Sequence, residues 1–394
     1  MHERSNSIVS RRVLVNATPV GTLEQFASGH FVFTYDRDCD PANFVSLLMP
    51  VRLASYSWHD LHPVFAACLP AEPVRGLLQE QLIRAGNKDP FALLDRCTVT
   101  AGRWQVLHSA AKPAPPDRQA TAELMEATDS RTYFQSLYAQ QYTPTLPLST
   151  LSLQRLAVAM DERYLYRADP GAGSEIYNEH CCAAIAQRAG FDIPEVVWSA
   201  DRRVMRLPRY DAGPKGRLGV EDLCALQGLP ASGRYTTSME RMVSVTAALV
   251  APVRRRAIRR ELFRRTVLAH LLGDTERHLK SYELCYQTID DVALGPLIGL
   301  CTDWSAPPGD PSLKPALSVV DQRSFVLKKG SWRRFAAHCS LADREASAII
   351  DWVSNAWAAE QQALREAATE LTRPWLRRLE EYWAIGAQRL RTAY

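Results

Sequence analysis

The segment LLGDTERHLKS, residues 271–281, constrains the fold of this chain more than any other stretch of its sequence. The apolar spacing before it predicts a helix over residues 254–272, and the short apolar runs after it, at 282–286 and 292–300, predict a β-hairpin. The hairpin leads to an acidic residue, Asp303. A helix, a polar loop, a hairpin and then a single aspartate is a layout that kinases use. Phosphoryl transfer requires one carboxylate to orient the acceptor hydroxyl and further ligands for Mg²⁺.

The rest of the chain mixes strand and helix patterns. The predicted strands are 13–15, 20–23, 30–35, 153–160, 163–167, 196–198 and 204–207, and the predicted helices before Ser238 are 77–85, 90–94 and 176–189. A proline-rich polar stretch at 110–122 predicts a linker or an exposed crossing, because two consecutive prolines favour an extended segment. After Ser238 helical patterns dominate. We therefore expect a small α/β unit, a strand-rich lobe and a large helical lobe.

The composition excludes several classes of protein. Hydrophobic residues make up 46% and charged residues 23% of the 394 residues, an ordinary balance for a globular protein. No apolar run approaches the roughly 18 residues that cross a bilayer, and the polar, basic start shows no secretory signal. We therefore expect a cytoplasmic protein without a membrane partner. Nine scattered cysteines with no CxxC pair indicate neither a disulfide scaffold nor a zinc module.

Two helical patterns allow a structural and a functional interpretation. Seven arginines lie between residues 254 and 265, although the net charge of the chain is only +4. We favour a solvated helix face over a patch for nucleic acid or an acidic partner, because no aromatic residues are interleaved for stacking. A second stripe has the i, i+3, i+4 spacing of one buried helical face. It consists of Ile349, Trp352, Val353, Ala356 and Trp357.

The loop GDTERHLKS resembles the catalytic loop of HipA-type kinases, whose usual pattern is G-N-x-D-x-H-x-K-N. Further segments match this family in the same order along most of the chain. They are VLVNATPVGTL, GHFVFTYD and SLLMPVR near the start, then Tyr177-Asn178-Glu179, Arg209-Tyr210-Asp211 and Glu221-Asp222-Leu223-Cys224. The resemblance implies an α+β, HipA-like protein-kinase fold. It would comprise an N-terminal α/β subdomain in residues 1–112, a strand-rich small lobe in 113–235 and an all-α large lobe in 236–394.

The resemblance also implies catalytic and metal-binding roles. Glu276 lies where the family has its catalytic aspartate, and His278 and Lys280 are the residues that the family has. Asp303 falls on the second metal-binding aspartate, and Ser281 on a Mg²⁺-ligating asparagine. We expect His278 to support the loop rather than act as the base, since the loop carboxylate takes that role. Lys280 would either cap the loop or meet a phosphate.

The nucleotide-binding positions follow in the same way. Arg167 falls on the lysine that reaches the phosphates, and Glu179 would be the partner of that cation. The family's phosphate-binding loop, S-x-x-G-x-Q-x-K, falls at residues 148–155, where Ser152 and Arg155 are the candidate contacts. ATP and Mg²⁺ are therefore the implied cofactors.

Four departures from the family pattern lie where the chemistry would occur. Glutamate at 276 displaces the carboxylate by about 1–1.5 Å, and misplacement of that size can cost on the order of 100-fold in rate. Ser281 offers Mg²⁺ one oxygen on a shorter side chain than asparagine. Arg167 places a planar guanidinium where the family has an ammonium. The segment LSTLSLQR at 148–155 has no glycine, so its side chains crowd the backbone donors that would approach phosphate.

Three hypotheses follow. The first is an active HipA-type serine/threonine protein kinase, the toxin of a toxin–antitoxin pair, with weakened activity. The second is a pseudokinase that binds nucleotide or a partner without phosphoryl transfer. The third is a different transferase or ligase on the same scaffold. The retained pair Glu276 and Asp303 favours the first, whereas Arg167, Ser281 and the loop without glycine favour the second.

The resemblance implies partners as well. The best-known members of the family phosphorylate glutamyl-tRNA synthetase and are held, with operator DNA, by a HipB-type helix-turn-helix antitoxin. We therefore expect a HipB-like antitoxin, and a protein substrate of which an aminoacyl-tRNA synthetase is the leading example. Contact with DNA would run mainly through the antitoxin, because this chain shows no recognition-helix motif of its own.

Overall fold

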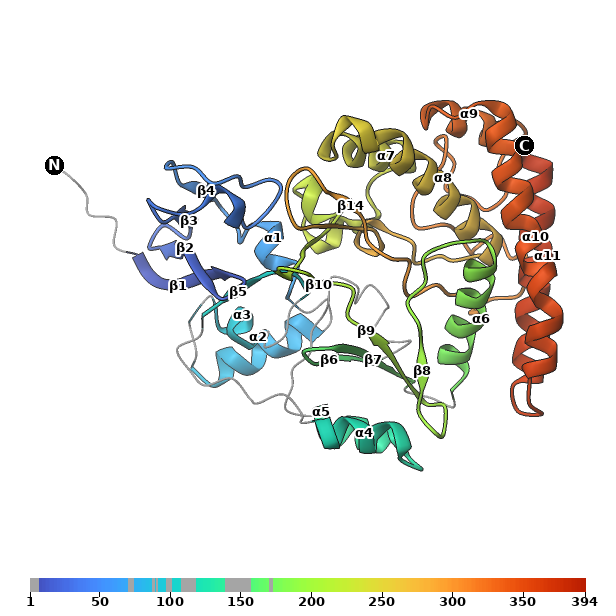
Figure 1. Ribbon diagram of the computed structural model, residues 1–394, viewed down its shortest axis with the longest axis horizontal. Helices are drawn as coiled ribbons and strands as arrows, with labels where there is room; N and C mark the ends of the chain where they lie inside the picture. Colours follow the sequence, from blue (N-terminus) through green and yellow to red (C-terminus); the bar gives the residue numbers. More distant parts are fainter. Residues whose placement is uncertain are drawn as a thin grey trace.

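The computed structural model describes residues 7–69, 74–86, 89, 91–96, 101–107, 118–138, 157–169 and 173–394. Its helices and strands form a mixed α and β protein, as the sequence predicts. An antiparallel sheet made by the first strands lies at one end of the molecule in Figure 1, and a pair of long helices lies side by side at the other. Within the described residues, no helix combines the length and apolar character needed to cross a membrane.

The N-terminal sheet has five strands in the order β4-β3-β2-β1-β5. Its strands are β1 (Ser7–Val15), β2 (Thr18–Phe26), β3 (Phe31–Tyr35), β4 (Tyr56–Trp58) and β5 (Trp104–Val106). The predicted hairpin and third strand are confirmed. Asn16 and Ala17 both have positive φ, the backbone twist that a two-residue hairpin turn requires. Alternate residues such as Val13 and Val15 point into a core of their own.

Short helices cover this sheet. They are η1 (Pro41–Asn43), α1 (Pro63–Ala66), α2 (Val74–Arg84) and α3 (Ala92–Arg96). The two helices predicted at 77–85 and 90–94 are present, with shifted ends. The carboxylate of Asp89 accepts a hydrogen bond from Phe91 N just before α3, as expected of a residue that caps a helix start. Pro90 lies outside the described residues.

A second antiparallel sheet has the order β6-β7-β9-β8. Its strands are β6 (Ala157–Met160), β7 (Tyr164–Ala168), β8 (Val197–Trp198) and β9 (Val204–Pro208), and α6 (Ser174–Arg188) follows β7. These elements confirm the predicted strands and the helix at 176–189. The first part of the strand predicted at 153–160, up to residue 156, lies outside the described residues.

The linker predicted at 110–122 is wrong in its last part. Helix α4 (Arg118–Glu126) begins inside it and is followed by α5 (Ser130–Tyr138), whereas residues 108–117 lie outside the described residues. Leu124 and Phe134 of these helices pack against Tyr166 of the second sheet. The apolar face of a helix that packs on a sheet outweighs a polar, proline-rich composition next to it.

Short strands link the second sheet to the loop singled out by the sequence. They are β10 (Ala212–Gly213), β11 (Gly216–Arg217), β12 (Gly219–Asp222), β13 (Glu283–Tyr286) and β14 (Ala293–Leu294). β12 pairs with β13, so that Asp222 lies opposite Glu283. Only the start of the apolar run predicted at 292–300 is a strand, and residues 295–300 have no regular structure.

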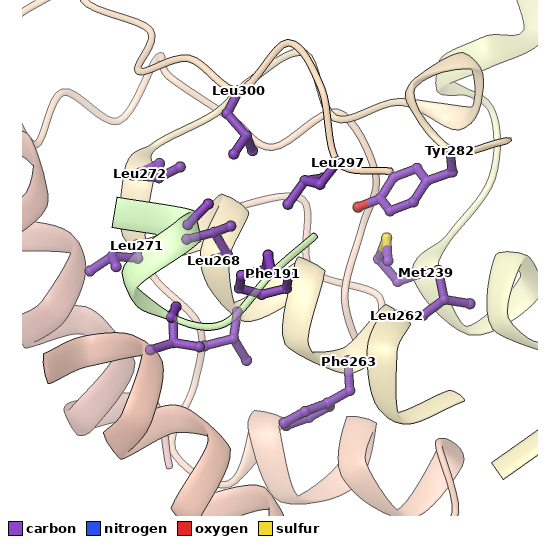
Figure 2. Packing of buried hydrophobic residues seen from close by; sticks show 14 of the residues in the cluster. Phe191, Met239, Leu262, Phe263, Leu268, Leu271, Leu272, Tyr282, Leu297 and Leu300 are labelled. Atoms are coloured by element: carbon purple, nitrogen blue, oxygen red, sulfur yellow. The ribbon is translucent and has the colours of Figure 1, made fainter. Parts of the chain in front are cut away.

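The large lobe predicted as all-α in residues 236–394 contains the longest helices, but the strands β13 and β14 also lie within it, so it is not all-α. The helices from residue 225 onward are η2 (Ala225–Gln227), η3 (Ala231–Tyr235), α7 (Met239–Leu249), η4 (Pro252–Arg254), α8 (Arg255–Leu272), η5 (Leu279–Ser281), α9 (Ser331–His338), α10 (Asp343–Ala367) and α11 (Arg373–Ala393). Helix α8 lies in the middle, and every residue of its second half from 265 to 272 is buried. Figure 2 shows Leu268 and Leu272 among Phe191, Leu297 and Leu300. The loop that follows therefore starts from a firmly packed helix end.

Trp352 does not belong to the buried stripe predicted for α10. Its side chain is 60% exposed, whereas Ile349, Val353 and Ala356 are buried. The indole Nε1 donates a hydrogen bond to Ala189 O at the end of α6, 3.0 Å away. The i, i+3 spacing places residue 352 at the edge of the stripe, where the ring lies over the neighbouring helix end instead of entering the core.

The arginine-rich face of α8 is solvated, as predicted, except at its end. Arg254, Arg255 and Arg256 are exposed, but Arg265 is buried. Its Nε pairs with Glu261 at 2.9 Å and another nitrogen donates to Gly295 O at 2.8 Å. The solvated-face prediction is therefore wrong for Arg265, because the end of α8 is covered on all sides and the guanidinium finds its partners inside.

Candidate active site

The acidic loop, residues 273–281, starts where α8 ends. Gly273 has a φ of 68° and closes the helix in the left-handed conformation, a role that favours glycine. The next residue, Asp274, is buried and accepts hydrogen bonds from Glu276 N at 3.0 Å and from Arg277 Nε at 2.9 Å. Arg277 in turn donates to the carbonyls of Ile298 and Gly299. These contacts fix the acidic loop to the segment that precedes Asp303.

The structure brings Glu276 and Asp303 onto adjacent loops. Asp303 N donates to Gly273 O at 3.1 Å, and Thr275 Oγ1 donates to Asp303 Oδ2 at 2.6 Å. The other carboxylate oxygen of Asp303 accepts from Ser305 N at 3.0 Å. Asp303 is 9% exposed, and the Glu276 side chain is 24% exposed. Both carboxylates therefore lie at the same edge of the lobe, with Glu276 the more accessible.

Two helices, α6 and α11, hold the segment that carries Asp303 through hydrogen bonds to Thr302. Asn178 of α6 donates to Thr302 O at 2.8 Å and accepts from Thr302 N at 3.0 Å. Trp383 of α11 donates from Nε1 to Thr302 Oγ1 at 2.8 Å. Helix α11 also comes so close to α8 that a Cβ at Gly386 would overlap Leu271 O. The position of Asp303 thus depends on elements from distant parts of the chain.

His278 and Ser281 contact each other at the C-terminal end of the acidic loop. Ser281 Oγ donates to Glu276 O at 2.7 Å and is 3.2 Å from His278 Nδ1. His278 is fully buried, and this burial, together with nearby cationic side chains, lowers its pKa well below the usual value. A neutral, enclosed imidazole fits the supporting role expected of His278 rather than that of a base.

Lys280 points away from Glu276. Its Nζ donates to Asp222 Oδ2 at 2.6 Å, and both side chains are buried. The other oxygen of Asp222 accepts from the backbone nitrogens of Cys224 and Ala225. This contact ties the acidic loop to β12, and the choice between a loop cap and a phosphate contact stays a prediction.

Arg167 and Glu179 form a buried ion pair. Arg167 on β7 and Glu179 on α6 approach to 2.9 Å, with side chains 1% and 7% exposed. Burial lowers the pKa of Arg167 and raises that of Glu179, and the attraction between them opposes both shifts. Arg167 Nε makes no hydrogen bond within the described part of the chain. Ser152 and Arg155, the other candidate nucleotide contacts, lie outside the described residues.

A small apolar pocket lies beside this ion pair. Its volume is about 30 Å³, and Glu179, Val196, Met205, Leu207, Leu297 and Leu300 are among its lining residues. These come from β9, from the residue just before β8, from α6 and from the irregular segment before Asp303. A pocket of this volume has room for roughly two water molecules. It is too small to enclose a purine in this arrangement of the lobes.

The acidic side chains can supply only part of a metal shell. Among the residues that the structure describes, no three His, Cys, Asp or Glu side chains converge as metal ligands. Mg²⁺ commonly takes one or two protein carboxylates and completes its shell with phosphate oxygens and water. Asp303 is a carboxylate of the kind that this pattern requires, whereas the hydroxyl of Ser281 donates to Glu276 O and contacts His278.

Three residues near Glu276 were not found from the sequence. Tyr235 donates from its hydroxyl to Glu276 Oε2 at 2.9 Å, Thr275 binds Asp303, and Asp274 organises the loop. Tyr235 is on a short 3-10 helix far away in sequence, so no local spacing indicates this contact. Asp274 could have been noticed, because it is a short polar side chain immediately after a helix-ending glycine, where such residues bind backbone nitrogens.

Comparison with known proteins gives consistent matches. The sequence model of the HipA-like C-terminal domain matches residues 161–361, and that of the HipA N-terminal domain matches residues 11–106. Putative kinase Y4dM of Sinorhizobium fredii is 23% identical in an alignment of 392 positions, which spans 89% of this chain and 91% of that protein. HipA of Shewanella oneidensis MR-1, solved with HipB and operator DNA, has a TM-score of 0.66 at 14% identity over 96% of both chains. This structural likeness shows a shared fold.

Proposed function

Because this chain belongs to the HipA family, both of whose domains it matches, we propose that it is a serine/threonine protein kinase with weakened activity. The observation that carries this proposal is the pairing of Glu276 and Asp303 on adjacent loops, joined through Gly273 and Thr275. Two carboxylates in this arrangement suit the two tasks of phosphoryl transfer, which are orienting the acceptor hydroxyl and holding Mg²⁺.

The proposed roles follow from where each side chain lies. Glu276 accepts the proton of a serine or threonine hydroxyl, since it is the more exposed of the two carboxylates. Asp303 and Ser281 would hold Mg²⁺, and ATP would supply the phosphoryl group. Arg167 would meet the phosphates through its unbonded Nε. Because Arg167 is enclosed and the neighbouring pocket is small, we expect the lobes to separate when nucleotide enters.

A pseudokinase is the second candidate. Both oxygens of Asp303 already accept hydrogen bonds from the protein, and Arg167 is almost completely covered. A hydrogen-bonded carboxylate oxygen keeps a lone pair for a metal, but the ion pair of Arg167 would have to open before a phosphate could reach the guanidinium. The enclosed Arg167 favours a module that engages nucleotide weakly or recognises a partner without catalysis.

We propose the partners from the membership of this chain in the HipA family. Shewanella oneidensis HipA was solved in complex with HipB and operator DNA. We propose that this chain likewise binds a HipB-like antitoxin as the toxin of the pair and reaches DNA mainly through it. We further propose a protein substrate, with an aminoacyl-tRNA synthetase as the first to be tried.

Calorimetric titration with a non-hydrolysable ATP analogue, with and without Mg²⁺, tests the proposal first. We expect binding that requires Mg²⁺ and is abolished in Asp303→Ala. Phosphate transfer from labelled ATP, to the chain itself or to added protein, should be lost in Glu276→Gln. Asp351→Ala, at an exposed position of α10, is the matched control and should behave like the wild type.

Each outcome separates the candidates. Mg²⁺-dependent binding with transfer that requires Glu276 supports the kinase. Binding without transfer under any condition supports the pseudokinase. Unchanged nucleotide binding in Asp303→Ala would contradict the metal assignment. No nucleotide binding by the wild type would overturn the kinase and leave a module whose function lies in recognising a partner.

A further inference from the structure

A tyrosine from outside the acidic loop binds the carboxylate proposed as the base. Tyr235 ends the 3-10 helix η3, and its hydroxyl donates to Glu276 Oε2 at 2.9 Å. The same ring meets His278 edge-on, with ring centroids 4.9 Å apart. Tyr235 therefore contacts both the carboxylate and the imidazole that supports the loop.

Two arginine side chains also contact the ring of Tyr235. The guanidinium of Arg234 lies 4.9 Å from the ring centroid, and that of Arg323 lies 5.8 Å from it. The backbone beneath is a tight turn, in which Thr236 donates from both N and Oγ1 to Gly233 O. A ring fixed by a neighbouring imidazole and two cations presents its hydroxyl in one direction.

Glu276 is held at both of its ends by the same group of residues. Its backbone carbonyl accepts from Ser281, which contacts His278, and its carboxylate accepts from Tyr235, which packs on His278. A glutamate has one more rotatable bond than an aspartate and loses more rotamer freedom when it is ordered. A partly exposed glutamate at this position therefore needs an additional contact to stay in one rotamer.

We propose that Tyr235 is a positioning residue that fixes the Glu276 carboxylate and so compensates for its additional methylene. This inference rests on the proposed kinase function, because its consequence is measured as phosphoryl transfer. Within the acidic loop, His278 Nε2 lies 3.9 Å from Glu276 Oε2, which is longer than a hydrogen bond. A catalytic group kept in its productive geometry by a fixed donor loses less rate to misplacement.

Tyr235→Phe removes the hydroxyl and leaves the ring against His278. We expect kcat to fall by about tenfold or more, while KM for the Mg²⁺–nucleotide stays unchanged. A role limited to packing would leave kcat unchanged as well, because the ring stays in place.

A double-mutant cycle with Glu276→Asp makes the test specific. Aspartate withdraws the carboxylate by about 1–1.5 Å, away from the tyrosine hydroxyl. In this background Tyr235→Phe should change kcat by less than about threefold, because the two residues no longer interact. Tyr133→Phe is the matched control, since it removes a hydroxyl that donates to Glu123 at 2.7 Å on the surface of α4 and α5.

The outcomes distinguish the inference from the function on which it rests. An equal loss from Tyr235→Phe in both backgrounds, or no loss in the wild-type background, overturns the positioning role and leaves the kinase intact. A wild-type chain that transfers no phosphate in a Glu276- and Asp303-dependent way overturns the function, and the positioning role with it. Coupling between Tyr235 and Glu276 in kcat, with KM unchanged, supports both.

Discussion

Lys280 and Asp222 form a buried ion pair that fixes the acidic loop to β12. The Nζ to Oδ2 distance is 2.6 Å, and the Asp222 side chain is fully enclosed. In Asp222→Asn, the amide oxygen of asparagine can still accept from Cys224 N and Ala225 N. The substitution removes the negative charge that Lys280 faces. We expect the free energy of unfolding to fall by about 3–5 kcal/mol, because a buried charge is left uncompensated.

Chemical denaturation in urea measures this loss, with Asp351→Asn on the exposed face of α10 as the control. The double variant Asp222→Asn with Lys280→Met should recover part of the stability, since no unpaired ammonium remains. A loss in Asp222→Asn no larger than that of the control would show that Lys280 reaches water instead of remaining buried.

Glu283 gives stability a dependence on pH. Burial raises its pKa from 4.5 to about 8, although the hydroxyl of Tyr210 and the ammonium of Lys280 favour its charged form, and Asp222 and Asp211 oppose it. The unfolded chain ionises this group from about pH 4.5, whereas the folded chain keeps the proton up to about pH 8. The folded state binds the extra proton, so stability falls as pH rises through this window, by about 1.4 kcal/mol per pH unit.

Glu283→Gln should remove this slope, so that the variant becomes more stable than the wild type as the pH approaches 8. Urea denaturation at several pH values across the window compares the two proteins. Parallel stability curves for the wild type and Glu283→Gln would show that Glu283 is ionised in the folded chain.

Around Glu276, the site residues that the sequence predicted all lie in the acidic loop or just after the hairpin that follows it. Glu276 and Asp303 stand on either side of a hairpin, and a hairpin returns its ends to one place, so their meeting could be expected. Tyr235 and Trp383 reach the same site from distant elements. Their contacts depend on how the helices pack, which no local spacing encodes.

At the scale of elements, the crossing of α11 over α8 sets the position of the acidic loop. Gly386 lies where the two helices come closest, against Leu271 O. Gly386→Ala adds a methyl group that must displace the backbone of α8. We expect a net loss of about 1–3 kcal/mol from overpacking, although alanine in a helix interior normally gains about 1 kcal/mol over glycine.

Thermal unfolding of Gly386→Ala tests this crossing. Ala384→Gly, on the exposed face of the same helix, reports helix propensity alone and should cost about 1 kcal/mol. A Gly386→Ala variant that is more stable than the wild type would mean that the helices are further apart than described.

The long helices could be predicted from the sequence, whereas the edge of a helical stripe and a helix next to prolines could not. The spacing that indicates α8 and α6 is strong because most residues on the buried face of each are apolar. α4 was missed because its apolar residues are few and its neighbouring prolines suggest a linker. Trp352 was misplaced because a residue at the edge of a helical stripe can face the core or the next helix with almost the same periodicity.

At the scale of the whole molecule, a buried glutamate is one of the residues that join the N-terminal unit to the rest, beside the contacts of Asn16 with Arg217 and of Gly102 with Asp211. Glu221 on β12 accepts from Ser46 Oγ at 2.6 Å, Leu47 N at 2.8 Å and Tyr286 Oη at 2.6 Å. Glu221→Ala leaves three donors without their acceptor, at a cost of about 1–3 kcal/mol for each that stays buried. The N-terminal sheet has its own core, so we expect it to come loose without unfolding.

Scanning calorimetry should then resolve two transitions in Glu221→Ala where the wild type shows one, and limited proteolysis should cut between the two parts first. Glu370→Ala, at an exposed position, is the control. A single, merely lowered transition in Glu221→Ala would show that the two parts unfold together and that this glutamate is not what holds them.

Because α11 supports the segment that carries Asp303 and lies at the C-terminal end of the chain, the candidate site is completed late in translation. A ribosome releases the acidic loop and Asp303 before the helix that carries Trp383 and Gly386, at roughly 5–20 residues per second. For some seconds the newly made segment has neither the indole that binds Thr302 nor the helix that packs on Leu271. The candidate site of the emerging polypeptide therefore lacks these contacts until α11 has docked. The time needed to translate residues 304–393 sets when the site is complete.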